Sequence, residues 1–348
     1  MEKLTFSKFY WQQRKNMEVW RVGRISAPEW GTQKHPSEPN EKPYRHIVPF
    51  DNWEETLFEG IKCELTKYIK VPGQEINTHD GVHNLLSSWI LCANLYFLAR
   101  TDEKFKALMV DFLKLKVSDK IAEITDIELE FAFPKGDNLH PELLLGELNG
   151  SRGKYQTSPD IAFFVKTKTG IGIILTESKY LEHNFYPCST NPDQSKKVNN
   201  PNPDFSRCKQ SAKGYDYKSI CYQTVMKRKY MDLIDFSSIA ENVLLQCPAA
   251  SDGYQLFRQQ ALAEGIAKSG RFDLVVSSVA FDDRNSDLKE CLRTSGIDDF
   301  QTGWGELFEG KAIFKTWTHQ DWVKFVRDNQ VNGEFDEWLD YLNQRYGY

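Results

Sequence analysis

The chain has 348 residues, of which 40% are hydrophobic and 27% charged, and this balance excludes disordered, collagen-like and coiled-coil proteins. Its longest apolar stretch, 85–99, is interrupted by Ser87, Ser88 and Asn94 and is too short to cross a membrane as a helix. The N-terminus lacks an apolar signal segment, and the seven cysteines include no Cys-x-x-Cys pair. These features predict a cytoplasmic protein that does not enter membranes.

In chain order, residues 1–50 are rich in Trp, Pro and polar groups, and we expect an irregular N-terminal arm followed by a single domain over 51–348. Apolar residues recur every four positions within 53–70, which predicts a helix. The nearly all-apolar stretch 82–100 and the stretch 102–115 predict two more helices. Alternating polarity then predicts a strand over 127–133, followed by strands over 160–166 and 171–179 that form a tight hairpin.

In the second half of the chain, the pattern of apolar residues predicts a helical stretch over 213–234, a short strand over 242–247, a helix over 254–268 and a strand over 272–281. Two further helices are expected near 320–328 and 335–345. This order of elements is typical of an α/β fold with a mixed central sheet flanked by helices.

The predicted hairpin brings charged residues together. Centred between positions 168 and 169, it pairs residues whose numbers sum to 337, so Asp160 faces Glu177, and Lys179 shares their face. Two opposed carboxylates repel each other unless a cation lies between them. Oxygen ligands without His or Cys favour Mg²⁺ or Mn²⁺, and the backbone carbonyl of Ser178 is a further candidate ligand. Lys179 is expected to orient or deprotonate a water and to stabilise the transition state of phosphodiester cleavage.

Pro159-Asp160 followed by Glu177-Ser178-Lys179 resembles the motif of the PD-(D/E)XK nuclease superfamily, whose fold is shared by many restriction endonucleases. Over about residues 44–326 the chain also resembles a branch of uncharacterised bacterial proteins assigned as restriction endonucleases. The stretches that carry this similarity are Gly146-Glu147, Ser151-Arg152-Gly153, Thr157-Ser158-Pro159-Asp160, Lys179-Tyr180 and Trp317-Thr318-His319-Gln320-Asp321-Trp322.

The resemblance implies a restriction-endonuclease-like αβββαβ core, extended here by N-terminal and C-terminal helices. It implies a Mg²⁺-dependent DNA endonuclease in host defence, with Asp160 and Glu177 as metal ligands and Lys179 as the catalytic lysine. A homodimer and defence-system partner proteins are both open as assemblies. Family members often carry another acid before the motif.

Three acids of this chain are candidates for that additional ligand. Glu54 and Glu64 flank the apolar face of the helix expected over 53–70, and Glu147 lies in the loop before Asp160. We favour Glu147, for which the alternative is a solvated loop acid.

Basic residues gather in one segment of this acidic chain. Residues 196–229 hold nine bases and two acids, a charge of +7 against −12 for the rest of the chain. Such asymmetry is typical of a protein that meets a polyanion with one face. The candidate nucleic-acid contacts are Lys213, Lys227, Arg228 and Lys229 in this segment, together with Arg152. Duplex DNA is the partner that the resemblance implies, whereas charge alone allows RNA equally.

Other interpretations remain open at this stage. Asp160, Glu177 and Lys179 could form a salt-bridge ladder on an exposed sheet face. The chain could be a nucleic-acid-binding module without catalysis, or a structural subunit of a larger complex. His79 and His83 have the spacing of a zinc-hydrolase pair, but helix capping near His79 is the favoured interpretation. Gln223 could position a water or a base, although a surface glutamine is the simpler interpretation.

Overall fold

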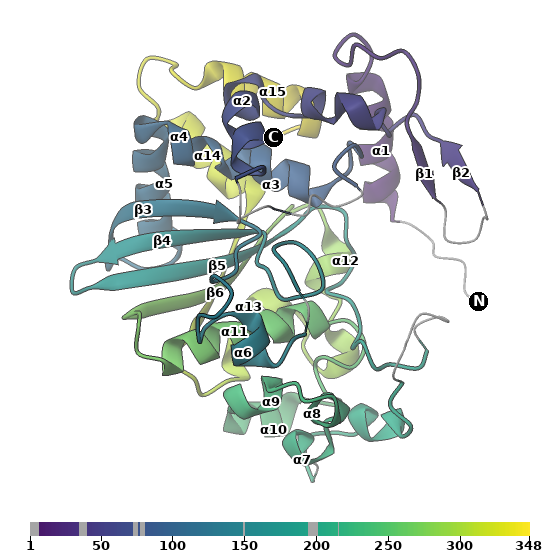
Figure 1. Ribbon diagram of the computed structural model, residues 1–348, viewed down its shortest axis with the longest axis vertical. Helices are drawn as coiled ribbons and strands as arrows, with labels where there is room; N and C mark the ends of the chain where they lie inside the picture. Colours follow the sequence, from purple (N-terminus) through teal and green to yellow (C-terminus); the bar gives the residue numbers. More distant parts are fainter. Residues whose placement is uncertain are drawn as a thin grey trace.

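The structure is a computed structural model that describes residues 7–34, 40–71, 76, 81–148, 150–193, 201–214 and 216–348. In these residues the chain folds around a five-stranded mixed sheet that carries helices on both faces (Figure 1). A search of this part of the chain finds no helix with the length and apolar character needed to span a membrane.

The region expected as an irregular arm contains a helix, α1 (Lys8–Trp20), and two short paired strands, β1 (Thr32–Lys34) and β2 (Glu41–Pro43). The Ser7 hydroxyl begins α1 by accepting from the Tyr10 amide at 3.1 Å. The buried face of α1 is formed by Gln13, Met17 and Trp20, spaced four and three residues apart. A polar residue on this face conceals the helical period in the sequence, so the expectation of an irregular segment is wrong for α1.

Helices of the N-terminal half broadly follow the apolar pattern. Elements η1 (Phe50–Thr56) and α2 (Glu59–Tyr68) occupy the predicted helix 53–70, and α5 (Glu103–Lys116) occupies 102–115. The buried stretch 82–100 forms two helices, α3 (Ser88–Tyr96) and α4 (Leu98–Thr101), rather than one.

The central sheet has the order β3 (Ile121–Leu129), β4 (Ile161–Thr167), β5 (Ile171–Lys179), β6 (Leu274–Phe281) and β7 (Ile313–Thr318). The pairs β3–β4 and β4–β5 are antiparallel, whereas β5–β6 and β6–β7 are parallel. The first strand begins earlier than predicted, because two irregularities in its pairing stretch the spacing of its apolar residues from two to three.

Two hydrophobic cores lie on the two faces of the sheet. One packs α1 to α5 together with α14 (His319–Asn329) and α15 (Asp336–Tyr346). The other packs α6 (Pro141–Leu145), α11 (Tyr254–Lys268) and α13 (Phe300–Glu306), and Figure 1 shows these helices on the opposite side of the sheet. The predicted helix 254–268 is confirmed by α11.

The long connection between β5 and α11 differs from its prediction. In place of one helix over 213–234 it forms α7 (Tyr217–Ile220), α8 (Tyr222–Val225) and α9 (Tyr230–Leu233), preceded by η2 (Phe205–Lys209). Extended backbone at Cys221 and a left-handed φ of 61° at Lys227 interrupt the helix. The predicted strand 242–247 is wrong, because α10 (Ser238–Val243) covers its first residues. Figure 1 shows α7 to α10 beyond α11, away from the sheet.

Short elements complete the chain after β6. They are α12 (Ser286–Lys289) and η3 (Arg293–Ser295), which precede α13. The predicted helices 320–328 and 335–345 are confirmed by α14 and α15.

Candidate active site

The hairpin of β4 and β5 has the predicted register. Its pairs include Ile161 with Thr176, whose numbers sum to 337 as expected. At the open end of this hairpin, Asp160 Oδ2 accepts a hydrogen bond of 2.7 Å from the Ser178 amide. Because side chains alternate along a strand, Asp160, Glu177 and Lys179 lie on the face of the sheet that α11 covers.

Glu177 and Lys179 form a buried ion pair. Their side chains are 6% and 3% exposed, and Lys179 Nζ lies 3.1 Å from Glu177 Oε1. Gln255, at the start of α11, accepts from Lys179 Nζ at 2.7 Å and donates to Glu177 Oε1 at 2.5 Å. The salt bridge of the alternative interpretation is present between Glu177 and Lys179, but the exposed sheet face that it assumed is wrong. Glu177, Lys179 and Gln255 form a closed hydrogen-bonded triangle.

The charged groups of the site shift one another's pKa values. Burial, followed by the negative charges of Glu177 and Glu130, raises the pKa of Asp160 well above its usual range. Burial alone would lower the pKa of Lys179, but the carboxylates of Glu177 and Glu182 outweigh it and raise that pKa. At Asp160 the effects of burial and of neighbouring negative charge thus outweigh the positive charge of Lys179, while Lys179 remains an ammonium.

A third acid, Glu130, is a neighbour that the sequence analysis did not select. Its amide donates to the Asp160 carbonyl at 2.9 Å, and the register of β3 with β4 continues to this pair. Glu130 is buried and has a left-handed φ of 47°, a conformation that costs free energy in a non-glycine residue. Extending the observed registers of β3–β4 and β4–β5 places Glu130, Asp160 and Glu177 in one row, but the irregular register of β3 with β4 gave no signal in the sequence.

Glu147, the third acid favoured from the sequence, has other partners. Its Oε1 accepts from Tyr230 OH at 2.7 Å, from Arg258 Nε at 3.0 Å and from Thr157 Oγ1 at 2.6 Å. Its Oε2 accepts from the Thr157 amide at 2.5 Å. Burial raises the pKa of Glu147, but the Arg258 guanidinium and these hydrogen bonds outweigh burial and lower it. Glu147 is thus buried with both oxygens hydrogen-bonded within the protein, and the interpretation as a solvated loop acid is wrong.

Arg152 supports the end of β3. It donates to the carbonyls of Leu129 at 2.6 Å and Glu130 at 3.2 Å, and it forms an ion pair of 3.2 Å with Glu128. The arginine therefore lies beside the acidic row and holds the backbone that presents Glu130.

The predicted nucleic-acid contacts of the basic segment fall into two groups. Arg228 donates to the Gly146 carbonyl and Lys229 to the Leu143 carbonyl at 2.9 Å, so both side chains cap the end of α6. Lys213 and Lys227 are exposed. Two further bases of this segment, at positions 196 and 197, lie outside the described residues.

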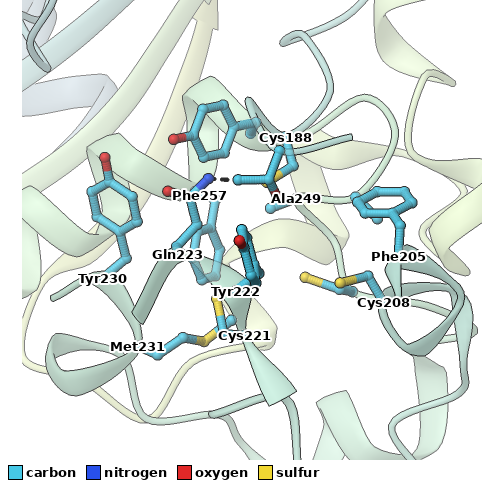
Figure 2. Close-up of a pocket in the computed structure, with 14 residues that line it drawn as sticks. Cys188, Phe205, Cys208, Cys221, Tyr222, Gln223, Tyr230, Met231, Ala249 and Phe257 are labelled. Atoms are coloured by element: carbon cyan, nitrogen blue, oxygen red, sulfur yellow. Dashed lines mark hydrogen bonds between the residues drawn. The ribbon is translucent and has the colours of Figure 1, made fainter. Parts of the chain in front are cut away.

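A small closed pocket of about 20 Å³ lies between α11 and the helices α8 and α9 (Figure 2). Four of its lining residues are Cys188, Cys208, Cys221 and Cys247, and burial raises the pKa of Cys208 to about 11. Gln223 is buried here and donates to Cys188 Sγ at 3.2 Å, so the interpretation as a surface glutamine is wrong. This pocket is core packing beneath the basic segment.

The end of β5 is anchored from the opposite face of the sheet. His319 Nε2 lies 3.1 Å from the Lys179 carbonyl, and His319 Nδ1 lies 3.0 Å from Tyr96 OH. Burial lowers the pKa of His319 to about 4, so the ring is neutral near pH 7. His319 therefore fixes the backbone that carries the lysine.

Among the residues that the structure describes, no three His, Cys, Asp or Glu side chains are grouped closely enough to hold a metal ion. Asp160 and Glu177 thus offer two carboxylates, with Glu130 nearby. Of the possible zinc pair, His79 lies outside the described residues, and His83 Nε2 contacts the Thr32 carbonyl at 3.3 Å.

Comparison with known proteins identifies the family to which the chain belongs. Residues 13–347 match the model of a family described as restriction endonuclease associating with ARP. No curated protein and no solved structure matches the chain. Since the match covers nearly the whole sequence, the chain belongs to the family of restriction endonucleases associating with ARP.

Proposed function

We propose that this protein is a metal-dependent nuclease of the PD-(D/E)XK type, which hydrolyses phosphodiester bonds at Asp160, Glu177 and Lys179. The observation that carries the proposal is the opposition of two carboxylates beside a buried lysine at the end of β4 and β5. A binding module or a structural subunit has no need of opposed acids, which cost stability when no cation is present.

Backbone geometry supports Ser178 as a further ligand. The amide and carbonyl of one strand residue point to the same side, and the Ser178 amide points toward Asp160. In the hairpin register the position opposite Ser178 is Pro159, which has no N–H to donate to the Ser178 carbonyl. This carbonyl and the two carboxylates form a set of hard oxygen donors that suits Mg²⁺ or Mn²⁺.

We propose Glu130 as the additional acid in place of Glu147. Glu130 continues the row of Asp160 and Glu177 across three neighbouring strands, and its charge raises the pKa of Asp160. Glu147 has both oxygens engaged by Thr157, Tyr230 and Arg258. When bound at the acidic row, Mg²⁺ would supply Lewis-acid polarisation of the phosphate and activation of water.

The chain's own residues have separate tasks in the hydrolysis, in which water adds to phosphorus and the bond to one ester oxygen breaks. Lys179 donates its ammonium hydrogens toward the oxygens that gain negative charge in the transition state. Gln255 holds the lysine by one hydrogen bond and Glu177 by another, which fixes their relative position. His319 holds the backbone of Lys179 from behind.

The substrate and setting are proposed with the support of the family match. We propose that the substrate is duplex DNA and that the protein acts in host defence. We also propose a cytoplasmic location, which suits the seven free cysteines. The family description names association with ARP, and we propose that this chain also acts with such a partner.

The direct test is an incubation with supercoiled plasmid, linear duplex DNA and single-stranded RNA in Mg²⁺, in Mn²⁺ and in EDTA, with and without the ARP partner. We expect cleavage that requires the metal and Lys179, with Lys179→Ala as the inactive control. Absence of cleavage under all these conditions, together with no binding of Mn²⁺ by calorimetry, would contradict the proposal.

A further inference from the structure

An open cleft of about 540 Å³ lies beside the acidic row, within the size range of ligand sites. It opens along the edge strand β3 and its neighbour β4, and Glu128 and Phe164 are among its lining residues. Phe164 and Asp160 are four positions apart and therefore share a face, roughly 13 Å apart along the strand. The cleft and the candidate active site thus lie on the same face of the sheet. We refer to it as the β3 cleft.

The floor of the β3 cleft is aromatic. Phe131 contacts Phe164 with a ring separation of 5.2 Å and Phe133 with 4.9 Å, both edge to face. Phe131 is also linked to the active site, because its amide donates to the Pro159 carbonyl at 3.0 Å. Phe164 is half-buried, so part of its ring faces the opening. An aromatic surface of this kind suits the flat face of a nucleobase, which stacks on phenylalanine.

The wall of the β3 cleft contains an unused hydrogen-bond acceptor. Gln156 is 8% exposed, and its buried Oε1 accepts no hydrogen bond from any described group. A buried polar atom without a partner costs stability in the free protein, and a ligand that donates a hydrogen bond to Oε1, once the carboxamide turns toward the cleft, would remove that cost. The amide nitrogen of Gln156 lies 3.5 Å from Ser158 Oγ, which orients the carboxamide.

A donor accompanies this acceptor. His140 lines the same cleft, and its Nδ1 accepts from the Glu142 amide at 3.2 Å. Burial lowers the pKa of His140, so the ring is neutral and carries its proton on Nε2. One acceptor and one donor match a base edge that presents an amino group beside a ring nitrogen, as in adenine and cytosine.

Positive charge lies at the rim. Lys135 is exposed and forms no ion pair with any described acid, and Arg152 also lines the cleft. Arg152 is paired with Glu128, so the exposed ammonium of Lys135 is the cation that suits a phosphate flanking a bound base.

We propose that the β3 cleft binds an unpaired nucleobase, adenine or cytosine, of the strand whose backbone reaches Asp160 and Glu177. This inference rests on the proposed nuclease function and adds that the enzyme recognises an unstacked or extruded base. Stacking on the aromatic floor requires a base whose face is not already stacked within a duplex.

The test measures binding in EDTA, where cleavage does not contribute. Fluorescence anisotropy compares single-stranded dA and dC 12-mers with an abasic 12-mer, which keeps the phosphates and lacks the bases. We expect the wild type to bind the base-containing strands about tenfold more tightly, as one good base contact provides. Ala132→Phe, which fills the cleft, and Gln156→Leu, which removes the acceptor, should reduce this ratio to near one.

Ala312→Phe is the matched control, because Ala312 is also a half-buried alanine but precedes β7. It should keep the wild-type ratio. Equal binding of base-containing and abasic strands by the wild type, or an unchanged ratio in Ala132→Phe, would overturn the inference. A protein that cleaves DNA with Mg²⁺ but shows no such ratio would overturn this inference alone. A protein that shows the ratio but never cleaves would overturn only the nuclease proposal.

Discussion

Two buried carboxylate clusters on the same face of the sheet differ in how their charge is balanced. Glu147 is surrounded by Arg258, Thr157 and Tyr230, and all of them donate to its oxygens. Asp160 and Glu177 face each other, and Lys179 is the cation between them and α11. The pKa of Glu147 in the first cluster is lowered, whereas the pKa of Asp160 in the second cluster is raised.

The difference teaches how to separate structural acids from functional ones. Both clusters are built from charged groups that seldom lie in protein interiors. In the Glu147 cluster the protein itself supplies every partner, so the acid is part of the fold. In the Asp160 cluster the negative charge of the acids exceeds the positive charge of Lys179, so the cluster would attract an external cation.

The largest expected effect concerns the structural cluster. Glu147→Gln leaves the Arg258 charge without its carboxylate, and we expect a loss of about 3 kcal/mol in the free energy of unfolding. Urea unfolding measures it. Glu142→Gln changes an exposed acid of α6 and should leave stability within about 0.5 kcal/mol. Equal stability of the Glu147 variant and wild type would show that this acid is dispensable for the fold.

The second prediction concerns the cluster of Asp160, Glu177 and Lys179, which we propose as the active site. Lys179→Ala should reduce cleavage by about 10²–10³-fold, since a single transition-state donor is lost. Mn²⁺ binding should persist, because both carboxylates remain. The apoprotein should be less stable, as Glu177 loses its buried partner, and Mn²⁺ should restore stability. Lys166→Ala removes an exposed cation of β4 and should cleave like wild type. A Lys179 variant with wild-type turnover would remove the lysine from the mechanism.

The third prediction compares the acids in the metal-free protein. Asp160→Asn relieves repulsion with Glu177, so apoprotein stability should not fall, whereas cleavage should be lost. Asp119→Asn, at an exposed acid, is the control for loss of charge alone. Thermal unfolding in EDTA measures the effect, and a clear decrease for Asp160→Asn would mean that Asp160 is a structural acid like Glu147.

The pH dependence of the two clusters should have opposite signs. Glu147 has a folded pKa below its ordinary value of 4.5, so its contribution is present above that value and is lost as the pH falls through the folded pKa. Asp160 has a folded pKa above its ordinary value of 3.8, so stability is lost as the pH rises from there through the folded pKa.

The measurement is urea unfolding between pH 3 and pH 8 in EDTA. The destabilisation by Glu147→Gln should shrink at the acid end, while the advantage of Asp160→Asn should grow with rising pH. The same sign for both variants would remove the distinction between the clusters.

The smallest expected effect is on nucleic-acid binding. Because Arg228 and Lys229 cap α6, the exposed Lys213 and Lys227 are the cleaner sites to neutralise. Lys213→Gln with Lys227→Gln should lower the slope of log affinity against log salt by about 0.9 for each lost phosphate contact with duplex DNA. Lys120→Gln with Lys168→Gln, near the hairpin turn, is the control. An unchanged slope in the first pair would mean that this segment is a solvated surface.

Short-range patterns in the sequence were sufficient to predict the hairpin of β4 and β5, and therefore the positions of Asp160, Glu177 and Lys179 in the candidate site. The alternation of β4 and β5 and the two-residue turn fixed the register, which places Asp160 across from Glu177. The same local information predicted α5, α11, α14 and α15, since helical period and capping residues lie within each segment. Local rules succeed where an element's neighbours in sequence are also its neighbours in space.

Only the tertiary structure decided the features that join distant segments. β7 was missed because only one of its six residues is fully buried, and its parallel pairing with β6 leaves no turn signal between them. Glu147 meets Arg258 across 111 positions, and Gln255 meets Lys179 across 76, so no local pattern could assign either partner. Glu130 joined the acidic row only when the irregular register of β3 was known. Whether a buried acid is structural or functional depends on partners that the folded chain alone brings to it.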